Sequence, residues 1–299
     1  MSLGRLLAAL LANGKARAGL VLLGVLLVAV VVGPWFAQDP TDFVGVPLSP
    51  PSGEHWLGTT GQGQDVLAQL LAGGRVTLAV GVASGLGVVL IGALVGGLSA
   101  FLGGRADDLT GLLVNVFLVL PGLPLMVVLA AWLPPGPLTM LAVLVVTGWA
   151  WHARVLRSQV LSLRSADFVS AAVVAGESPL RVLVAEILPN MASLLASSFI
   201  GATLYGIGAQ VGLEYLGLGD LGAVTWGTTL YWAANDAALL TRSWWTFVPS
   251  GVAIAWVGFA LTLVNFGLDE VTSPRLAAGR RVAKAAGRVG PGPTPVLRG

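Results

Sequence analysis

The chain has 299 residues, of which 56% are hydrophobic and only 10% are charged, whereas soluble domains carry about 25% charged residues. Long stretches without charge exclude an ordinary soluble fold and predict an all-α, polytopic membrane protein, because backbone polar groups in lipid must be satisfied within each segment. The net charge of +2 gives no indication of nucleic-acid binding, and the lack of cysteine excludes disulfides and thiolate metal sites.

The N-terminal region predicts one membrane anchor. Residues 1–17 are expected to be cytoplasmic, with an interfacial helix over 3–11, and residues 18–36 form the first predicted transmembrane helix. Lys15 and Arg17 precede this apolar run, as basic residues do in a signal peptide. The run is longer than a usual signal core, and no small-x-small cleavage site follows it, so we interpret it as an uncleaved span.

The next segment, 37–75, is polar and is expected outside the membrane. Gly61 and Gly63 predict turns, and Asp65 before an apolar-periodic stretch predicts a helix cap. No Lys-Ser/Thr pair follows these glycines and no strand precedes them, which excludes a nucleotide-binding loop. His55 lies in this segment and His152 near the other side of the membrane, so the two histidines cannot share a metal site. No cofactor is expected.

Residues 76–268 form the predicted transmembrane core. With the first helix, the apolar runs predict about six spans of roughly 20 residues or more: 18–36, 76–102, 109–133, 138–153, 191–213 and 246–268. The pairs Gly81/Gly85, Gly92/Gly96 and Gly208/Gly212 have small-xxx-small spacing, which more often brings helix backbones together than lines a pore.

Residues in two of the predicted spans can be interpreted in two ways. Pro121 and Pro124 predict a kink in the third span. With Asn115 earlier in the same span, Pro121 could face a translocation path, and a purely structural kink fits equally well. Trp256 in the last span is either a packing residue or a contact to a transported solute.

Charge assigns the loops to sides of the membrane. Of the 16 Lys and Arg residues, only Arg75 and Arg242 fall outside the segments expected on the same side as the N-terminus. The positive-inside rule therefore predicts that both termini and the loop 158–190 are cytoplasmic, and that the loop 214–243 is external. The tail, 269–299, is rich in Gly, Pro, Ala and Arg and is predicted to be disordered.

The loop 158–190 carries the most specific pattern. Ala171-Ala172 is followed by Gly176 and then by Ile187 and Pro189. This spacing resembles the EAA loop of ABC importer permeases, with a serine where that family has glutamate. The resemblance implies a coupling helix near 168–182 that docks on an ATPase subunit, with contacts from Ser170, Ala171, Ala172, Gly176, Glu177 and Arg181. Small residues that merely pack a cytoplasmic hairpin are the alternative.

Three further blocks resemble one branch of the same family, the C-type permeases of dipeptide/oligopeptide importers. They are the "LGTTGQGQDVL" stretch from Leu57, with Thr60 and Gln64 in place of the family's Asp and Arg, the "LEYLGLG" stretch from Leu213 and the "WWTFVPSGVAI" stretch from Trp244. The resemblance implies a type I ABC importer permease-like fold in the bacterial inner membrane. It implies lipids around the chain and, as partners, a homologous second permease, two ATPases and an extracytoplasmic binding protein.

Other function classes fit the sequence less well. A secondary transporter usually places ionisable residues inside its spans, and the predicted span interiors carry none. No nucleophile–base set or metal-ligand cluster indicates an enzyme, so catalysis by this chain itself is not expected. A secondary transporter and a non-transporting membrane assembly protein remain the alternatives.

Overall fold

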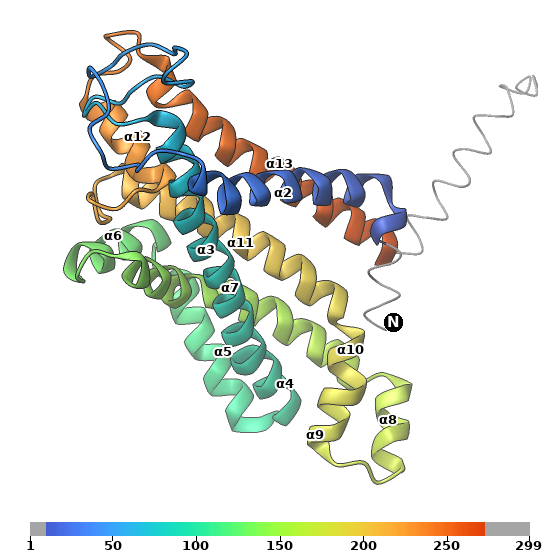
Figure 1. Ribbon diagram of the computed structural model, residues 1–299. Helices are drawn as coiled ribbons and strands as arrows, with labels where there is room; N and C mark the ends of the chain where they lie inside the picture. Colours follow the sequence, from blue (N-terminus) through green and yellow to red (C-terminus); the bar gives the residue numbers. More distant parts are fainter. Residues whose placement is uncertain (1–9, 273–299) are drawn as a thin grey trace, which may run out of the picture.

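The protein is all-helical in the part of the chain that the computed structural model describes, residues 10–272. Most of the expected interfacial helix 3–11 and the tail from residue 273 lie outside the described residues. Figure 1 shows an elongated bundle of long helices that cross one another, with short helices at both ends. The predicted all-α class is confirmed by this arrangement.

Within residues 10–272, five helices are long and apolar enough to cross a bilayer. They are α2 (Gly14–Val32), α3 (Val66–Gly92) with its continuation to Leu102, α7 (Pro137–Arg164), α11 (Ala192–Tyr215) and α13 (Val248–Thr272). The continuation consists of a π-helical turn, η2 (Ala93–Gly97), and α4 (Leu98–Leu102).

The third predicted span, 109–133, is not a straight helix. The chain forms α5 (Gly104–Val119) and α6 (Gly122–Trp132), and the two meet at a bend of 85°. The cause is Pro121, which lacks an N–H and disfavours helical geometry at the residue before it. Leu120 is accordingly extended, with φ −64° and ψ 135°. Counting the bent pair as one span gives six, in agreement with the sequence.

Several helix ends differ from the predicted ones. The helix α3 starts ten residues earlier than predicted, because Asp65 caps it there and accepts the N–H of Ala68 at 2.8 Å. The helix α7 continues to Arg164, since Leu156 and Val160 are buried while its polar residues stay outside. A short helix, α12 (Trp226–Asn235), forms within the loop 214–243 behind a Thr225–Thr228 capping box.

Helix α3 is the centre of the bundle and packs against α7 and α11. Its glycines allow this: a Cβ on Gly85 would meet the backbone of Thr203, and one on Gly92 would meet the backbone of Ala153. The interpretation of Gly81/Gly85 and Gly92/Gly96 as packing pairs is confirmed. Gly208 and Gly212 do not pack in this way, because nothing lies within 4 Å of a Cβ on either.

The first span, α2, packs along α13, and an arginine from α3 binds the carbonyl groups at its C-terminal end. Gly33, Pro34 and Trp35 turn the chain in a short 3-10 helix, η1 (Gly33–Trp35), and Pro34 has no N–H for the carbonyl of Val30. Arg75 supplies the missing donors, with Nε 3.0 Å from the Val30 oxygen and Nη2 2.5 Å from the Val31 oxygen. The only basic residue inside α3 therefore has a structural partner.

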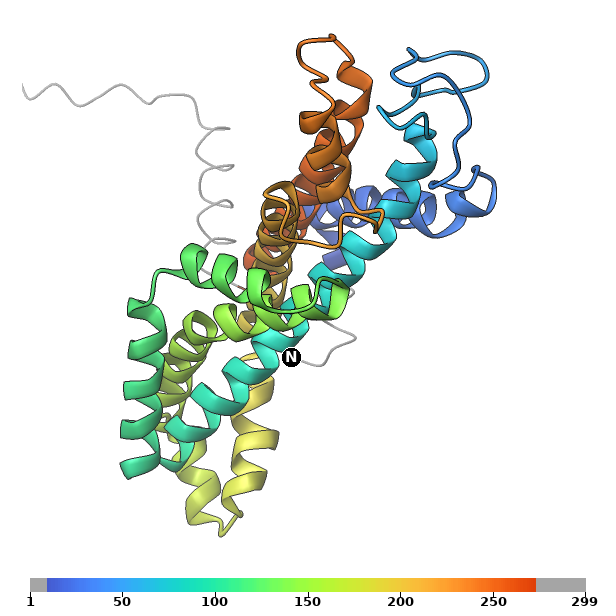
Figure 2. The same ribbon diagram turned by 90° about the vertical axis from the view of Figure 1, so that its left-hand side faces the viewer.

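Two assemblies of short elements lie at opposite ends of the bundle in both views (Figures 1 and 2). One end holds α8 (Asp167–Val174) and α9 (Pro179–Arg181), which we call the α8–α9 hairpin, residues 167–181. The other end holds residues 38–65, which we call the outer segment, together with α12. The long helices connect the two ends.

Candidate functional site

The α8–α9 hairpin is where the sequence placed the coupling helix. A single helix over 168–182 was wrong: the chain forms two short helices with a turn between them. Gly176 causes the turn, because its φ of +82° lies in the left-handed region, which glycine enters without strain. Its N–H donates to Val173 and that of Glu177 donates to Ala172, and these bonds close the end of α8.

The return from the hairpin to α11 is a widened helix. Pro179 begins α9, a π-helical stretch η3 (Val182–Ile187) follows, and α10 (Leu188–Asn190) leads into α11. Pro189 cannot donate to the carbonyl four residues before it, and the N–H of Leu188 reaches back to Leu183 instead. The predicted Ile-x-Pro element thus marks an irregular but continuous connection into α11.

One face of the hairpin is fixed to the bundle. Val169 from α8 and Val182 and Ile187 from η3 are buried together with Leu156 of α7 and Met191 before α11. Burying such side chains contributes about 1.5–3 kcal/mol each. A displacement of the hairpin must therefore also move the ends of α7 and α11.

The tip of the hairpin is apolar and exposed. Val174 is 88% exposed and Leu180 is 69% exposed, and Val173 and Val184 are exposed as well. A hollow of about 580 Å³ lies between this tip and α4, and Arg164 and Glu177 line it. Exposed apolar groups gathered in this way mark an interaction surface.

The six residues predicted to contact the ATPase lie on this hairpin in two different settings. Ser170, Ala171 and Gly176 are exposed, whereas Ala172 packs against the buried cluster under the hairpin. Glu177 and Arg181 form the ion pair expected from their spacing, with Oε2 to Nε at 2.8 Å. The apolar tip residues Val174 and Leu180 were not among the predicted contacts, although both lie within the predicted coupling helix.

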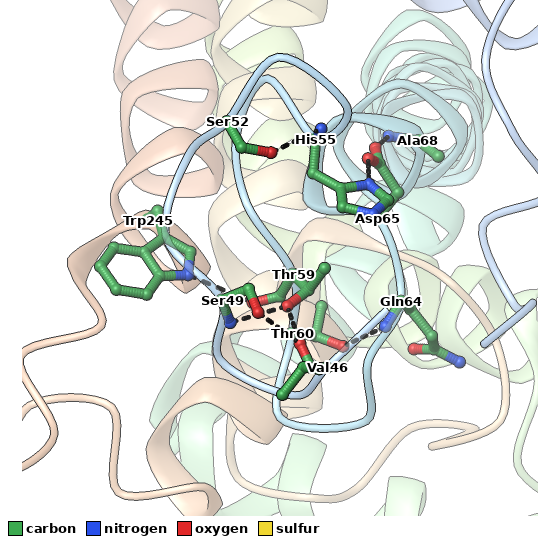
Figure 3. A network of polar contacts seen from close by, with 10 residues as sticks. All are labelled: Val46, Ser49, Ser52, His55, Thr59, Thr60, Gln64, Asp65, Ala68 and Trp245. Carbon is green, nitrogen blue, oxygen red and sulfur yellow. Dashed lines mark hydrogen bonds and ion pairs between the residues drawn. The ribbon is translucent and has the colours of Figure 1, made fainter. Parts of the chain in front are cut away.

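The outer segment folds through a polar network (Figure 3). One carboxylate oxygen of Asp65 caps α3, and the other lies 2.9 Å from His55 Nδ1. The Thr59 hydroxyl donates to the Val46 carbonyl at 2.7 Å and accepts the Ser49 N–H at 2.8 Å. The predicted cap at Asp65 is confirmed, and the segment has its own internal structure.

The outer segment is also tied to the loop before α13. Trp245 Nε1 donates to the Thr59 carbonyl at 3.2 Å (Figure 3), and the Asp236 carboxyl lies against Gly61. Burial raises the pKa of Asp236, and a hydrogen bond from the Gly61 backbone opposes that rise. Thr60, in place of the family's Asp, accepts the N–H groups of Gln62 and Gln64 at 3.2 Å, so an uncharged side chain holds this turn.

The structure holds the three predicted path residues in different local environments. The Asn115 amide oxygen on α5 accepts from Arg154 of α7 at 2.5 Å. Pro121 forms the bend between α5 and α6. Trp256 Nε1 on α13 donates to the Leu22 carbonyl of α2 at 3.0 Å, which supports its reading as a packing residue.

Comparisons with known proteins show the family to which the chain belongs. Residues 89–278 match the family model described as "Binding-protein-dependent transport system inner membrane component". The chain is 32% identical to the dipeptide transport system permease protein DppC of Bacillus subtilis, over 88% of this chain and 83% of that protein. It is 31% identical to the oligopeptide transport system permease protein OppC of the same organism, over 88% and 87%. A putative peptide permease protein of Brucella suis is 35% identical over 89% and 88%.

Proposed function

Because the chain belongs to the family of binding-protein-dependent transport system inner membrane components, we propose that it is the permease subunit that forms half of a peptide translocation pathway and couples it to ATPase subunits. The observation that carries this proposal is the α8–α9 hairpin. Its inner face is buried in the bundle and its apolar tip is exposed at one end. It is therefore built to transmit the movement of a docked partner.

The mechanism is alternating access between two arrangements of the long helices. Closure of the ATPase dimer on ATP moves the hairpin, and the buried contacts of Val182 and Ile187 pass the movement to α7 and α11. ATP shifts the equilibrium only by its differential affinity for the two arrangements. The chain carries no Gly-x4-Gly-Lys-Ser/Thr loop, so hydrolysis occurs on the partner subunits.

Each end of the bundle is assigned its own partner. A homologous second permease completes the pathway, and two ATPases contact the hairpins of the pair, here through Ser170, Ala171, Gly176, Glu177 and Arg181. An extracytoplasmic binding protein delivers the solute to the outer segment and α12. This assignment places both termini in the cytoplasm, as the Lys and Arg distribution favours.

The test is to place a charge on the hairpin tip. Leu180→Glu should prevent docking, because an exposed apolar contact would become a carboxylate buried without a partner, at a cost of several kcal/mol. We expect normal membrane levels, loss of ATPase co-purification and loss of uptake. The control is Ser158→Glu, on the exposed face of α7, which should behave as wild type. Normal ATPase association of the Leu180 variant would refute the docking role.

A further inference from the structure

One face of α11 is left uncovered by the described part of the chain. Gly201, Gly208 and Gly212 would each accept a Cβ with no atom within 4 Å. Tyr205 lies on the same helical face, since positions 201, 205, 208 and 212 follow helical spacing, and it is 51% exposed. The other side of α11 packs tightly on α3.

Two hollows lie along this face, one on each side of Tyr205. A hollow of about 490 Å³ lies between α6 and the outer half of α11, with Met126, Gly208 and Tyr215 in its wall. A second, of about 420 Å³, lies between α5, α7 and α11, with Thr147 and His152 in its wall. Tyr205 is the one described residue that lines both hollows, and its hydroxyl lies 4.0 Å from the Met126 sulfur.

The polarity of the inner hollow's wall argues against lipid as the occupant of that hollow. His152 and Thr147 lie in the middle part of α7, and polar or ionisable residues within spans face a bundle interior or a water-filled cavity. No Asp, Glu, Lys or Arg lines either hollow. A charged side chain that passes here would find no partner in this wall, and leaving such a charge without one is costly.

We propose that this face of α11 is the chain's wall of the translocation path, and that Tyr205 is the constriction that sets which peptide side chains pass. The outer compartment is apolar and the inner one is more polar, and the Tyr205 ring separates them. This wall favours peptides with small or apolar, uncharged side chains. The inference rests on the proposed function and adds to it the solute class and the selecting residue.

The first test uses the fact that the chain has no cysteine. In the assembled importer, Gly208→Cys places a single thiol in the open space of the outer hollow. The control, Val252→Cys, places one on an exposed position of α13. A membrane-impermeant maleimide needs a thiolate in contact with water. We expect labelling at 208 that saturating peptide blocks, and none at 252. A thiol at 208 as unreactive as the one at 252 would overturn the proposal.

The second test measures selection. Tyr205→Ala joins the two hollows, and Phe259→Ala removes an exposed aromatic ring elsewhere, on α13. With one binding protein, we compare uptake of a Trp-containing tripeptide with uptake of tri-alanine. The ratio should rise about tenfold for Tyr205→Ala, the scale at which pocket size discriminates, and stay unchanged for Phe259→Ala. If the Tyr205→Ala variant still transports and its uptake ratio is unchanged, the role of Tyr205 as a constriction is refuted, while the proposed function stands. If the wild type shows no ATP-driven uptake, the proposed function itself is refuted.

Discussion

At the scale of single residues, several polar side chains supply hydrogen bonds to backbone groups that have no backbone partner. Arg75 is the clearest case, because Pro34 removes the donor that the Val30 carbonyl would otherwise have. Neither the charge pattern nor the hydropathy predicts this contact. The sequence predicts Arg75 at a membrane boundary, and its partner 45 residues earlier in the chain is visible only in the fold.

Arg75→Met should lower stability by about 1 kcal/mol, because it leaves the carbonyls of Val30 and Val31 without their donor and water replaces it only in part. Arg75→Lys should fall between wild type and this variant, since one ammonium group reproduces the forked contact incompletely. Melting temperatures of the purified proteins in lipid nanodiscs check the order. If the Arg75→Met variant has the same melting temperature as wild type, Arg75 does not have this stabilising role.

The raised pKa of Asp236 predicts a pH effect on stability at the end that carries the outer segment. Burial raises its folded pKa above the ordinary 3.8, so proton binding favours the folded state. The stabilisation is fully present below pH 3.8 and is lost as the pH rises through the raised folded pKa. Asp236→Asn imitates the protonated form, and its melting temperature should exceed that of wild type at pH 7 and match it near pH 3.5. A variant that is less stable than wild type at pH 7 would contradict this sign.

At the scale of helices, composition and apolar length were enough to predict most spans, and local exceptions decided the rest. Pro121 was recognised as a kink, yet an 85° bend was not foreseen, because its size depends on how α6 packs. The coupling helix was expected as one helix near 168–182, whereas the positive φ of Gly176 divides the segment into two helices. The hollows along α11 were missed because they depend on which helices fail to cover a face.

The two kinds of glycine pair give a prediction about packing. Gly85→Val should destabilise the bundle by about 1–3 kcal/mol, since its Cβ would meet the Thr203 backbone nitrogen at 2.8 Å and α11 cannot yield without separating. Gly208→Ala is the matched control, because open space surrounds that position. Thermal unfolding of the two variants measures the difference, and equal melting temperatures would show that the α3–α11 contact is not tight.

At the scale of the whole molecule, the chain has two ends of different chemistry connected by long helices. The end that carries the outer segment is held by the Thr59 hydrogen bonds, the His55–Asp65 pair and the bond from the Gly61 backbone to Asp236. The other end presents the apolar tip of the α8–α9 hairpin. In the proposed mechanism the chain receives solute at the first end and mechanical work at the second, whereas a secondary transporter would be driven by an ion gradient.

The most direct measurement is peptide uptake by proteoliposomes that contain this chain, a homologous permease and two ATPases, with the binding protein supplied on its own side. The account predicts uptake that requires both ATP and the binding protein, is lost in Leu180→Glu and persists in Ser158→Glu. Uptake by the purified chain alone, driven by a proton or sodium gradient without ATP, would contradict it and establish the secondary-transporter alternative.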